Sequence, residues 1–155
     1  MKLRIVALGH RMPAWIAAGC DDYAKRMPRE YSIDMIELKP EPRDRGKPVP
    51  QMLAAEAVRL RAACTGYRVV ALDERGAQWT TREFAARLAK WHADAADVAF
   101  VIGSADGLDP AVKRDAQAVV ALSALTLPHG LARVLLAEQL YRAMTVNTGH
   151  PYHRD

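Results

Sequence analysis

The last nine residues, NTGHPYHRD (147–155), contain side chains that could do chemistry and few that could fill a core. His150 and His153 are donors, acceptors or bases near neutral pH, and Tyr152 and Arg154 add hydrogen-bond donors. A chain end usually buries too little to offset the entropy of fixing it. The segment is therefore either a frayed tail or a flap that closes over a site.

Metal and disulfide chemistry are not expected. His150 and His153 have the spacing of two metal ligands on a turn, but no second cysteine or acidic pair completes a ligand set, so we expect no metal site. Cys20 and Cys64 lie far apart in the chain and no secretory signal precedes them. We therefore expect two half-buried thiols rather than a disulfide.

Three segments at the ends of expected strands are candidates for a ligand site: ALDERG (71–76), VIGSADG (101–107) and LSALTLPHG (122–130). In open parallel sheets, ligands bind beyond the carboxyl ends of the strands. Gly103 and Gly107 let the backbone approach a ligand closely. Their spacing matches neither the dinucleotide-binding fingerprint nor a Walker loop.

The segment 122–130 is unusually apolar for a link between a strand and a helix, yet it contains Ser123 and His129. Such a loop can wrap a flat apolar group such as an adenine ring, whose edge is then read by backbone N–H and C=O groups. The alternative is that Leu125 and Leu127 only plug the end of the sheet.

Apolar runs alternate with helical segments along the chain, which predicts an α/β fold with a mostly parallel sheet and helices on both faces. The expected strands are 3–8, 32–38, 67–73, 98–103 and 118–123. The expected helices run from Pro13 until Pro28, over about 51–64, from a Thr80–Glu83 capping box to about Ala93, from Pro110 for a short stretch, and over about 130–146. We see no repeat, so residues 1–155 are expected to form one domain.

Charge and hydropathy indicate the kind of partner. The net charge is +4 and the pI is about 9.3, which suits a polyanion such as RNA or DNA. Positive charge gathers in the proline-rich loop PRDRGK (42–47) and in residues 25–30. Arg4 breaks the apolar opening and no run of ~18 apolar residues occurs, so we expect a soluble, cytoplasmic protein with no membrane partner.

The expected last helix is apolar on more than one side. A helix at the end of a small domain satisfies two apolar faces only if something covers the second, so we expect a two-fold partner that uses the same helix. Glu138 and Arg142 are four residues apart and either form a surface pair or leave Arg142 pointing toward the tail. The two apolar sets are Leu131, Val134 and Leu135, and Leu136, Leu140, Ala143 and Met144.

The segments LTLPH, RVLLAEQLYRA and NTGHPYHRD closely resemble the C-terminal third of the ribosomal large-subunit methyltransferase H family, small members of the SPOUT class of RNA methyltransferases. The opening MKLRIVALGHRMPAW, the ALDERG turn and VIGSADGL fit the same family, so the resemblance covers the whole chain. LSALTLPH and HPYHR are its most specific motifs.

The resemblance implies an enzyme that transfers a methyl group from S-adenosyl-L-methionine to N3 of a pseudouridine in helix 69 of 23S rRNA, in the assembled 70S ribosome. It also implies a deep trefoil knot near the C-terminus, which general topology rules disfavour. An obligate homodimer with its cofactor site near the interface is implied as well. Carried over by position, the cofactor pocket falls on Leu72, Gly103, Leu122, Ser123, Ala124, Leu125, Thr126 and Leu127.

The chain departs from the family pattern at two places. Members often have Gly-Pro-Glu or a similar sequence where this chain has Ser104-Ala105-Asp106, and often have proline where it has Gly130. The first departure leaves open whether Asp106 takes the role of the acidic residue. The second is expected to change only the first turn of the helix.

Under this resemblance, we expect the tail and the last helix to carry catalysis. An imide N3–H is weakly acidic, so a base or a nearby positive charge helps to remove its proton. We expect His153 to act as base or donor, Arg142 to stabilise the imide anion, and Tyr152 to stack on or hydrogen-bond the base. RNA contacts are expected at Arg154, Arg43, Arg45, Lys47 and His129.

Two other functions fit parts of the pattern. One is a non-catalytic, ribosome-associated RNA-binding module that uses the basic loops. The other is a metal-dependent hydrolase built on His129, His150 and His153.

Overall fold

A parallel sheet forms the centre of the computed structural model, which describes residues 1–43 and 46–154. Its strands are β1 (Lys2–Leu8), β2 (Ser32–Leu38), β3 (Arg68–Gln78), β4 (Val98–Ile102) and β5 (Ala118–Ala121). They lie in the order β2-β1-β4-β3-β5, and each neighbouring pair is parallel. The helices are α1 (Ala14–Lys25), α2 (Val49–Ala63), α3 (Thr81–Ala93), α4 (Pro110–Asp115) and α5 (His129–Thr148).

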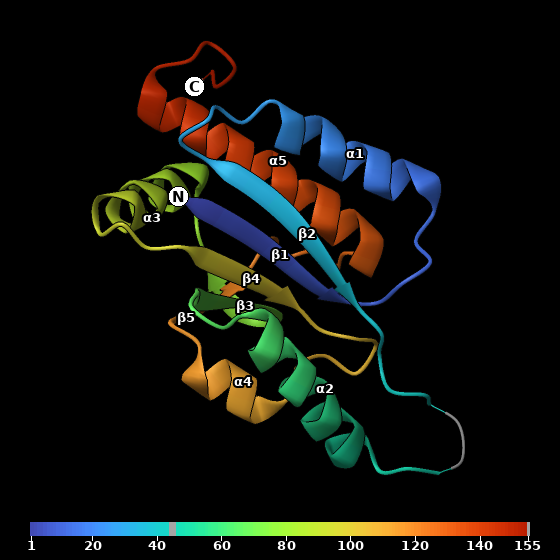
Figure 1. Ribbon diagram of the computed structural model, residues 1–155. Helices are drawn as coiled ribbons and strands as arrows, with labels where there is room; N and C mark the ends of the chain where they lie inside the picture. Colours follow the sequence, from blue (N-terminus) through green and yellow to red (C-terminus); the bar gives the residue numbers. More distant parts are fainter. Residues whose placement is uncertain (44–45, 155) are drawn as a thin grey trace.

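The sheet separates two layers of helices (Figure 1). One face is covered by α1, α3 and α5, and the other by α2 and α4. Successive strand residues point to opposite faces, so Ile5 belongs to the core under α3 and α5, whereas Val6 belongs to the core under α2 and α4. Both side chains are fully buried. The predicted α/β class, with a parallel sheet and helices on both faces, is confirmed.

Aromatic side chains hold α3 to the sheet. Phe100 of β4 is 1% exposed and meets Phe84 and Trp91 of α3 edge-on, with ring centroids 5.8 and 6.1 Å away. The expected capping box starts this helix: the Thr80 hydroxyl accepts the Glu83 N–H at 3.2 Å, and the Glu83 carboxylate accepts the Thr80 N–H at 2.7 Å.

Most expected boundaries are correct to within about two residues, but β3 is longer than the expected strand 67–73. It continues to Gln78 after an irregularity in which Val120 of β5 pairs with both Leu72 and Ala77. Gly76 permits this, because a Cβ there would lie 2.6 Å from the backbone of Val120. Residues 73–75 are thereby pushed out of the ladder at the end of the sheet.

Helix α5 is flanked on two sides within the chain. Val134 lies against Gly19 of α1, and Asn147 donates to the carbonyl of Ala85 in α3 at 2.9 Å. Helix α1 of the same chain therefore covers the Val134 side, and the expected two-fold partner stays a prediction. Gly130 does more than shape the first turn, since a Cβ there would lie 2.9 Å from Ile16 Cδ1.

Both cysteines are free, as expected, but they are buried rather than half-buried. Burial raises the pKa of the Cys64 thiol to about 11, and burial likewise raises that of Cys20. Both are therefore protonated near neutral pH and act as small apolar groups.

After β5, the chain crosses the carboxyl end of the sheet. Residues 122–128 leave the edge strand β5, and α5 then starts beside Gly9, which directly follows β1 on the far side of β3 and β4. This path is compatible with the expected trefoil knot, which stays a prediction. Within residues 1–43 and 46–154, no helix is long and apolar enough to cross a membrane.

Phe100→Ala is expected to lower the free energy of unfolding by about 3–5 kcal/mol, because it leaves a cavity between α3 and the sheet. Urea unfolding monitored by circular dichroism measures this. Val58→Ala is the control, since Val58 is 66% exposed on α2 and its truncation is expected to change stability by less than about 0.5 kcal/mol. Equal effects of the two variants would contradict the assignment of the core.

Candidate functional site

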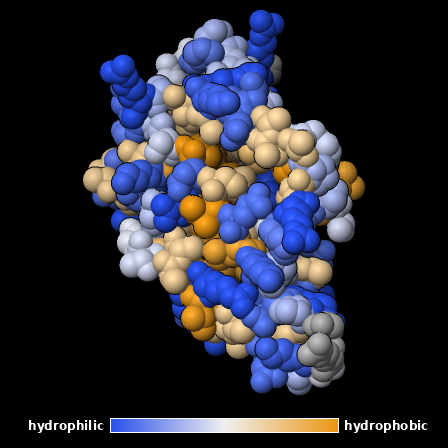
Figure 2. Space-filling model, turned by 45° about the vertical axis from the view of Figure 1, so that its right-hand side comes forward, coloured by the Kyte–Doolittle hydropathy of each residue, from blue (hydrophilic) through white to orange (hydrophobic). Residues whose placement is uncertain are grey.

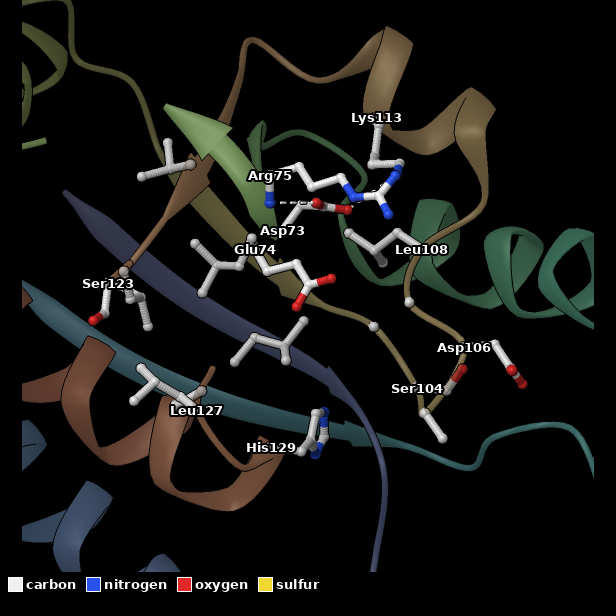
Figure 3. A pocket seen from close by; sticks show the side chains of 18 of the residues that line it. Asp73, Glu74, Arg75, Ser104, Asp106, Leu108, Lys113, Ser123, Leu127 and His129 are labelled. Atoms are coloured by element: carbon white, nitrogen blue, oxygen red, sulfur yellow. Dashed lines mark hydrogen bonds and ion pairs between the residues drawn. The ribbon is translucent and has the colours of Figure 1, made fainter. Parts of the chain in front are cut away.

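The three strand-end segments meet around one cavity of about 640 Å³ at the carboxyl ends of β3, β4 and β5 (Figure 3). Figure 2 turns the molecule so that the right-hand side of Figure 1 comes forward. In that view, apolar surface runs down the middle of the molecule between hydrophilic groups. The polar lining includes Ser123 on one side and Asp73, Lys113, Ser104 and Asp106 on the other. Convergence of segments distant in sequence is typical of a ligand site in a parallel α/β protein.

A tight glycine turn forms one wall. Gly103 packs so closely on Gly107 that a Cβ at residue 103 would lie 2.4 Å from the Gly107 carbonyl carbon. Gly107 has a φ of 83°, a value that favours glycine, and its N–H donates to the Ser104 carbonyl at 2.9 Å. The turn therefore exposes backbone to the cavity with little side chain in the way.

The apolar wall consists of Leu72, Leu122, Leu125 and Leu127. Leu125 is 75% exposed at the cavity, so it does not plug the end of the sheet. The Ser123 hydroxyl accepts the Leu125 N–H at 2.9 Å and so fixes the curvature of this loop.

Six of the eight residues expected around a cofactor line the cavity, and the other two belong to the same loop. Ala124 and Thr126 are exposed and do not line it. The six lining residues are Leu72, Gly103, Leu122, Ser123, Leu125 and Leu127.

The bulge after Leu72 brings charge to the cavity. The Asp73 carboxylate accepts from Lys113 Nζ at 3.0 Å and from the Arg75 N–H at 2.8 Å. Burial alone raises the pKa of Asp73, but these hydrogen bonds and the Lys113 charge outweigh burial, so the pKa is lowered and the carboxylate stays ionised. Asp73 lay within the ALDERG segment singled out from the sequence, whereas nothing in the sequence pointed to Lys113.

His129, which lines the cavity, lies one turn before the buried Arg133 on α5. Arg133 is 1% exposed; it donates to the Gly9 carbonyl at 3.0 Å and pairs with Glu37 of β2 at 3.3 Å. Its Nη2 also lies 3.4 Å from His129 Nδ1. Sequence reasoning missed Arg133, because a charged residue on an apolar helix gives no signal of being buried.

The His129 ring is held neutral. Burial lowers its pKa, the Arg133 charge lowers it further, and a weak backbone contact with Gly103 offsets only part of this. Its Nε2 atom is buried and has no partner within hydrogen-bond distance in the described part of the chain. A neutral ring that accepts at Nδ1 carries its proton at Nε2, so His129 can donate a hydrogen bond from there.

Two of the three expected catalytic residues, Arg142 and Tyr152, meet at the other end of α5. Glu138 accepts from Arg142 Nε at 2.8 Å and from the Tyr152 hydroxyl at 3.0 Å, and the Arg142 guanidinium lies 4.8 Å from the centre of the Tyr152 ring. The hydrogen bond to Glu138 raises the pKa of Arg142, so it stays charged. Burial and hydrogen bonds to Tyr23 and Glu138 raise the pKa of Tyr152, so it stays neutral. His153 directly follows Tyr152 in the sequence and is partly buried.

This tail cluster, Glu138, Arg142, Tyr152 and His153, does not reach the cavity of its own chain. His129 lines the cavity at the start of α5, and Arg142 lies about 20 Å further along the helix axis at 1.5 Å per residue. Figure 1 shows the C-terminus at the far end of α5. One protomer therefore presents the cavity and the tail at separate places.

The residues expected to contact RNA have different environments. Arg43 pairs with Glu56 and Asp106, Lys47 pairs with Glu41 at 3.2 Å, and Arg154 is exposed. Arg45 lies outside the described residues. In the described ranges, no group of three or more His, Cys, Asp or Glu could hold a metal ion.

Solved structures with this architecture include proteins described as probable methyltransferases. A probable methylase family protein from Haemophilus influenzae superposes with a TM-score of 0.62 over 99% of this chain and 70% of its own, at 15% identity. A probable methyltransferase from Bordetella pertussis gives a TM-score of 0.57 over 92% of this chain and 95% of its own, at 20% identity. The sequence profile described as "Predicted SPOUT methyltransferase" matches residues 1–153. Together, fold and profile define the class as SPOUT methyltransferase.

Relatives of much higher identity narrow this class. Ribosomal RNA large subunit methyltransferase H of Nitrosospira multiformis is 59% identical, and the protein of the same name from Paraburkholderia xenovorans is 56% identical. Each comparison extends over 155 residues and covers 99% of both chains. The chain belongs to the ribosomal RNA large subunit methyltransferase H family, so the resemblance predicted from its motifs is confirmed.

The lowered pKa of His129 has a consequence for stability. In the unfolded chain, His129 takes up a proton near its ordinary pKa of 6.5, whereas in the folded chain its pKa is lower. The folded state is therefore destabilised relative to the unfolded state as the pH falls below 6.5. Urea unfolding at about pH 7.5 and about pH 5.5 measures this. Wild type is expected to lose more stability on acidification than His129→Gln; equal losses would contradict the assignment.

Proposed function

We propose that the protein transfers a methyl group from S-adenosyl-L-methionine to N3 of a pseudouridine in helix 69 of 23S rRNA, on the assembled 70S ribosome in the cytoplasm. One observation carries the cofactor assignment: three separate strand-end segments, which both their position after the strands and the family resemblance nominated, surround a single cavity. The names of the relatives support rRNA as the substrate. The nucleotide and the ribosomal context come from the motif resemblance.

The cavity suits this cofactor in size and chemistry. Its volume of about 640 Å³ falls within the range of about 300–1,000 Å³ that is usual for small-ligand sites. Leu72, Leu122 and Leu127 offer apolar surface for an adenine, and the Gly103 turn offers backbone groups. Asp73 and Lys113 supply both charge signs for a zwitterionic amino-acid group. S-adenosyl-L-methionine supplies a methyl group that its positive sulfonium already activates.

The residues of the chain then have to orient the RNA base, exclude water and remove the N3 proton. Arg142 is fixed by Glu138 and stays charged, so it can stabilise the imide anion. Tyr152 is neutral and can stack on the base or donate to it. His153 is the proposed base or donor, and His129 can donate from Nε2 at the cavity.

Because the tail cluster lies about 20 Å along α5 from the cavity, we infer that a second copy supplies it. Leu131 and Leu135 of α5 remain partly exposed, and Trp15 of α1, the helix packed against α5, is 58% exposed. A two-fold pairing of these helices would cover that apolar surface and place the tail of each copy at the cavity of the other. The active enzyme is thus proposed to be a homodimer.

Methyl transfer onto ribosomes that lack the modification, with the modified nucleoside identified by mass, tests the function. Arg142→Ala and His153→Ala are expected to lower turnover by about 100-fold or more, since each removes acid–base or charge stabilisation. Affinity for S-adenosyl-L-methionine, measured by calorimetry, should stay near wild type. The control is Lys90→Ala, an exposed residue of α3.

The outcome also separates the alternatives. A wild type that binds ribosomes but gives no heat with S-adenosyl-L-methionine would be an RNA-binding module. Methylation that persists in excess chelator would exclude the metal-dependent hydrolase. Normal methylation by either tail variant would remove that residue from the mechanism.

A mixture of two inactive variants tests whether the tail acts across the dimer. Gly103→Val blocks the cavity and Arg142→Ala disables the tail, so the mixed dimer keeps one complete site only if cavity and tail come from different copies. Co-refolding in equal amounts is then expected to restore about a quarter of the wild-type activity, because half of the dimers are mixed and each has one working site. If the tail serves its own cavity, the mixture stays inactive.

A further inference from the structure

A buried carboxylate lies behind the glycine turn of the cavity. Glu56 of α2 is 1% exposed, although it is charged. Its Oε1 accepts the Glu41 N–H at 2.9 Å and a hydrogen bond from Arg43 Nη1, and its Oε2 accepts the Ser104 hydroxyl at 2.9 Å. Burial of a carboxylate is costly unless it is paired and hydrogen-bonded, and here both oxygens are satisfied.

Arg43 joins the same cluster to the turn. Its Nε donates to Asp106 at 2.9 Å, its Nη2 to the Ser104 hydroxyl at 2.6 Å, and its Nη1 to the Glu41 carbonyl at 2.7 Å. The hydrogen bond to Glu56 raises the pKa of Arg43. The planar guanidinium thus holds acceptors from α2, the preceding loop and the turn in one fixed arrangement.

The cluster has an inner and an outer half. Ser104 and Asp106 line the cavity, whereas Arg43 and Glu56 do not. Ser104 and Asp106 are also the two polar side chains between the glycines of the turn. Glycine gives a turn more conformational freedom than any other residue, so a turn between Gly103 and Gly107 needs outside contacts to stay in one shape.

We propose that Arg43 and Glu56 are positioning residues of the cofactor site, which hold the turn 103–107 in its ligand-binding shape through Ser104 and Asp106. This rests on the proposed function, in which the cavity binds S-adenosyl-L-methionine. A turn fixed before binding loses less entropy when the ligand arrives. Arg43 consequently serves the cofactor and not an RNA phosphate, because Glu56 and Asp106 already neutralise its charge.

Arg43→Lys is the first test, since lysine keeps the charge but lacks the planar fork. Calorimetry is expected to show an affinity for S-adenosyl-L-methionine about 10-fold weaker, in line with the loss of hydrogen bonds between charged groups. The KM for ribosomes and kcat at saturating cofactor should not change. Arg61→Lys is the matched control, because Arg61 forms an exposed pair with Asp115.

A double-mutant cycle shows whether Arg43 acts through the turn. Ser104→Ala is expected to weaken cofactor binding to a similar degree. The double variant Arg43→Lys/Ser104→Ala should bind the cofactor no more weakly than either single variant, because both substitutions break the same connection between Arg43 and the turn. Hydrogen–deuterium exchange should quicken in peptides containing 103–108 of each variant. Thermal unfolding of each variant confirms that the chain is folded.

Each possible result decides the proposal. If Arg43→Lys leaves the cofactor affinity unchanged and raises the KM for ribosomes, Arg43 is an RNA contact. That result would overturn the positioning role of Arg43 but not the proposed function. Additive effects in the cycle would overturn the positioning role too. If the wild type does not bind S-adenosyl-L-methionine, both the positioning role of Arg43 and the proposed function are overturned. The two failures are distinguishable, because only this one is seen in the wild type.

Discussion

The buried Arg133 fixes where α5 begins, and the cavity depends on that position. Its bonds to the Gly9 carbonyl and to Glu37 hold the start of α5 beside the ends of β1 and β2. The chain must therefore travel from the edge strand β5 past β3 and β4, roughly 14 Å at about 4.8 Å per strand. Residues 122–128 reach at most about 23–25 Å, so they span the sheet end with about 9–11 Å to spare, and they form a wall of the cavity.

The same helix carries chemistry at both of its ends. At its start, burial and the nearby Arg133 guanidinium lower the pKa of His129 and keep its ring neutral, which preserves a donor beside the cavity. At its end, the hydrogen bond to Glu138 raises the pKa of Arg142 and keeps it charged, while burial and hydrogen bonds to Tyr23 and Glu138 raise the pKa of Tyr152 and keep it neutral. A positive charge, that of Arg133, acts at the start of α5, and a negative charge, that of Glu138, acts at its end. The two ends lie too far apart to act on one RNA base within a chain.

Much of the fold followed from patterns that are local in sequence. Uninterrupted apolar runs gave the strands, the Thr80–Glu83 pair gave the start of α3, and the strand ends gave the segments that line the cavity. The bulge at residues 73–75 was missed because it depends on how closely Gly76 approaches Val120, a contact between distant segments. Arg43 appeared to be a free cation for the same reason, since its partners Glu56 and Asp106 lie far along the chain.

A two-fold pairing would resolve the separation of cavity and tail with a single contact surface. If two copies of α5 run antiparallel, the end of each helix lies near the start of the other, and symmetry completes two sites at once. The Glu138–Arg142–Tyr152 contacts then have a purpose before any RNA binds: they order a chain end that would otherwise fray and keep its charge in place. The tail therefore needs to be fixed on its own chain even if it works on its neighbour's substrate.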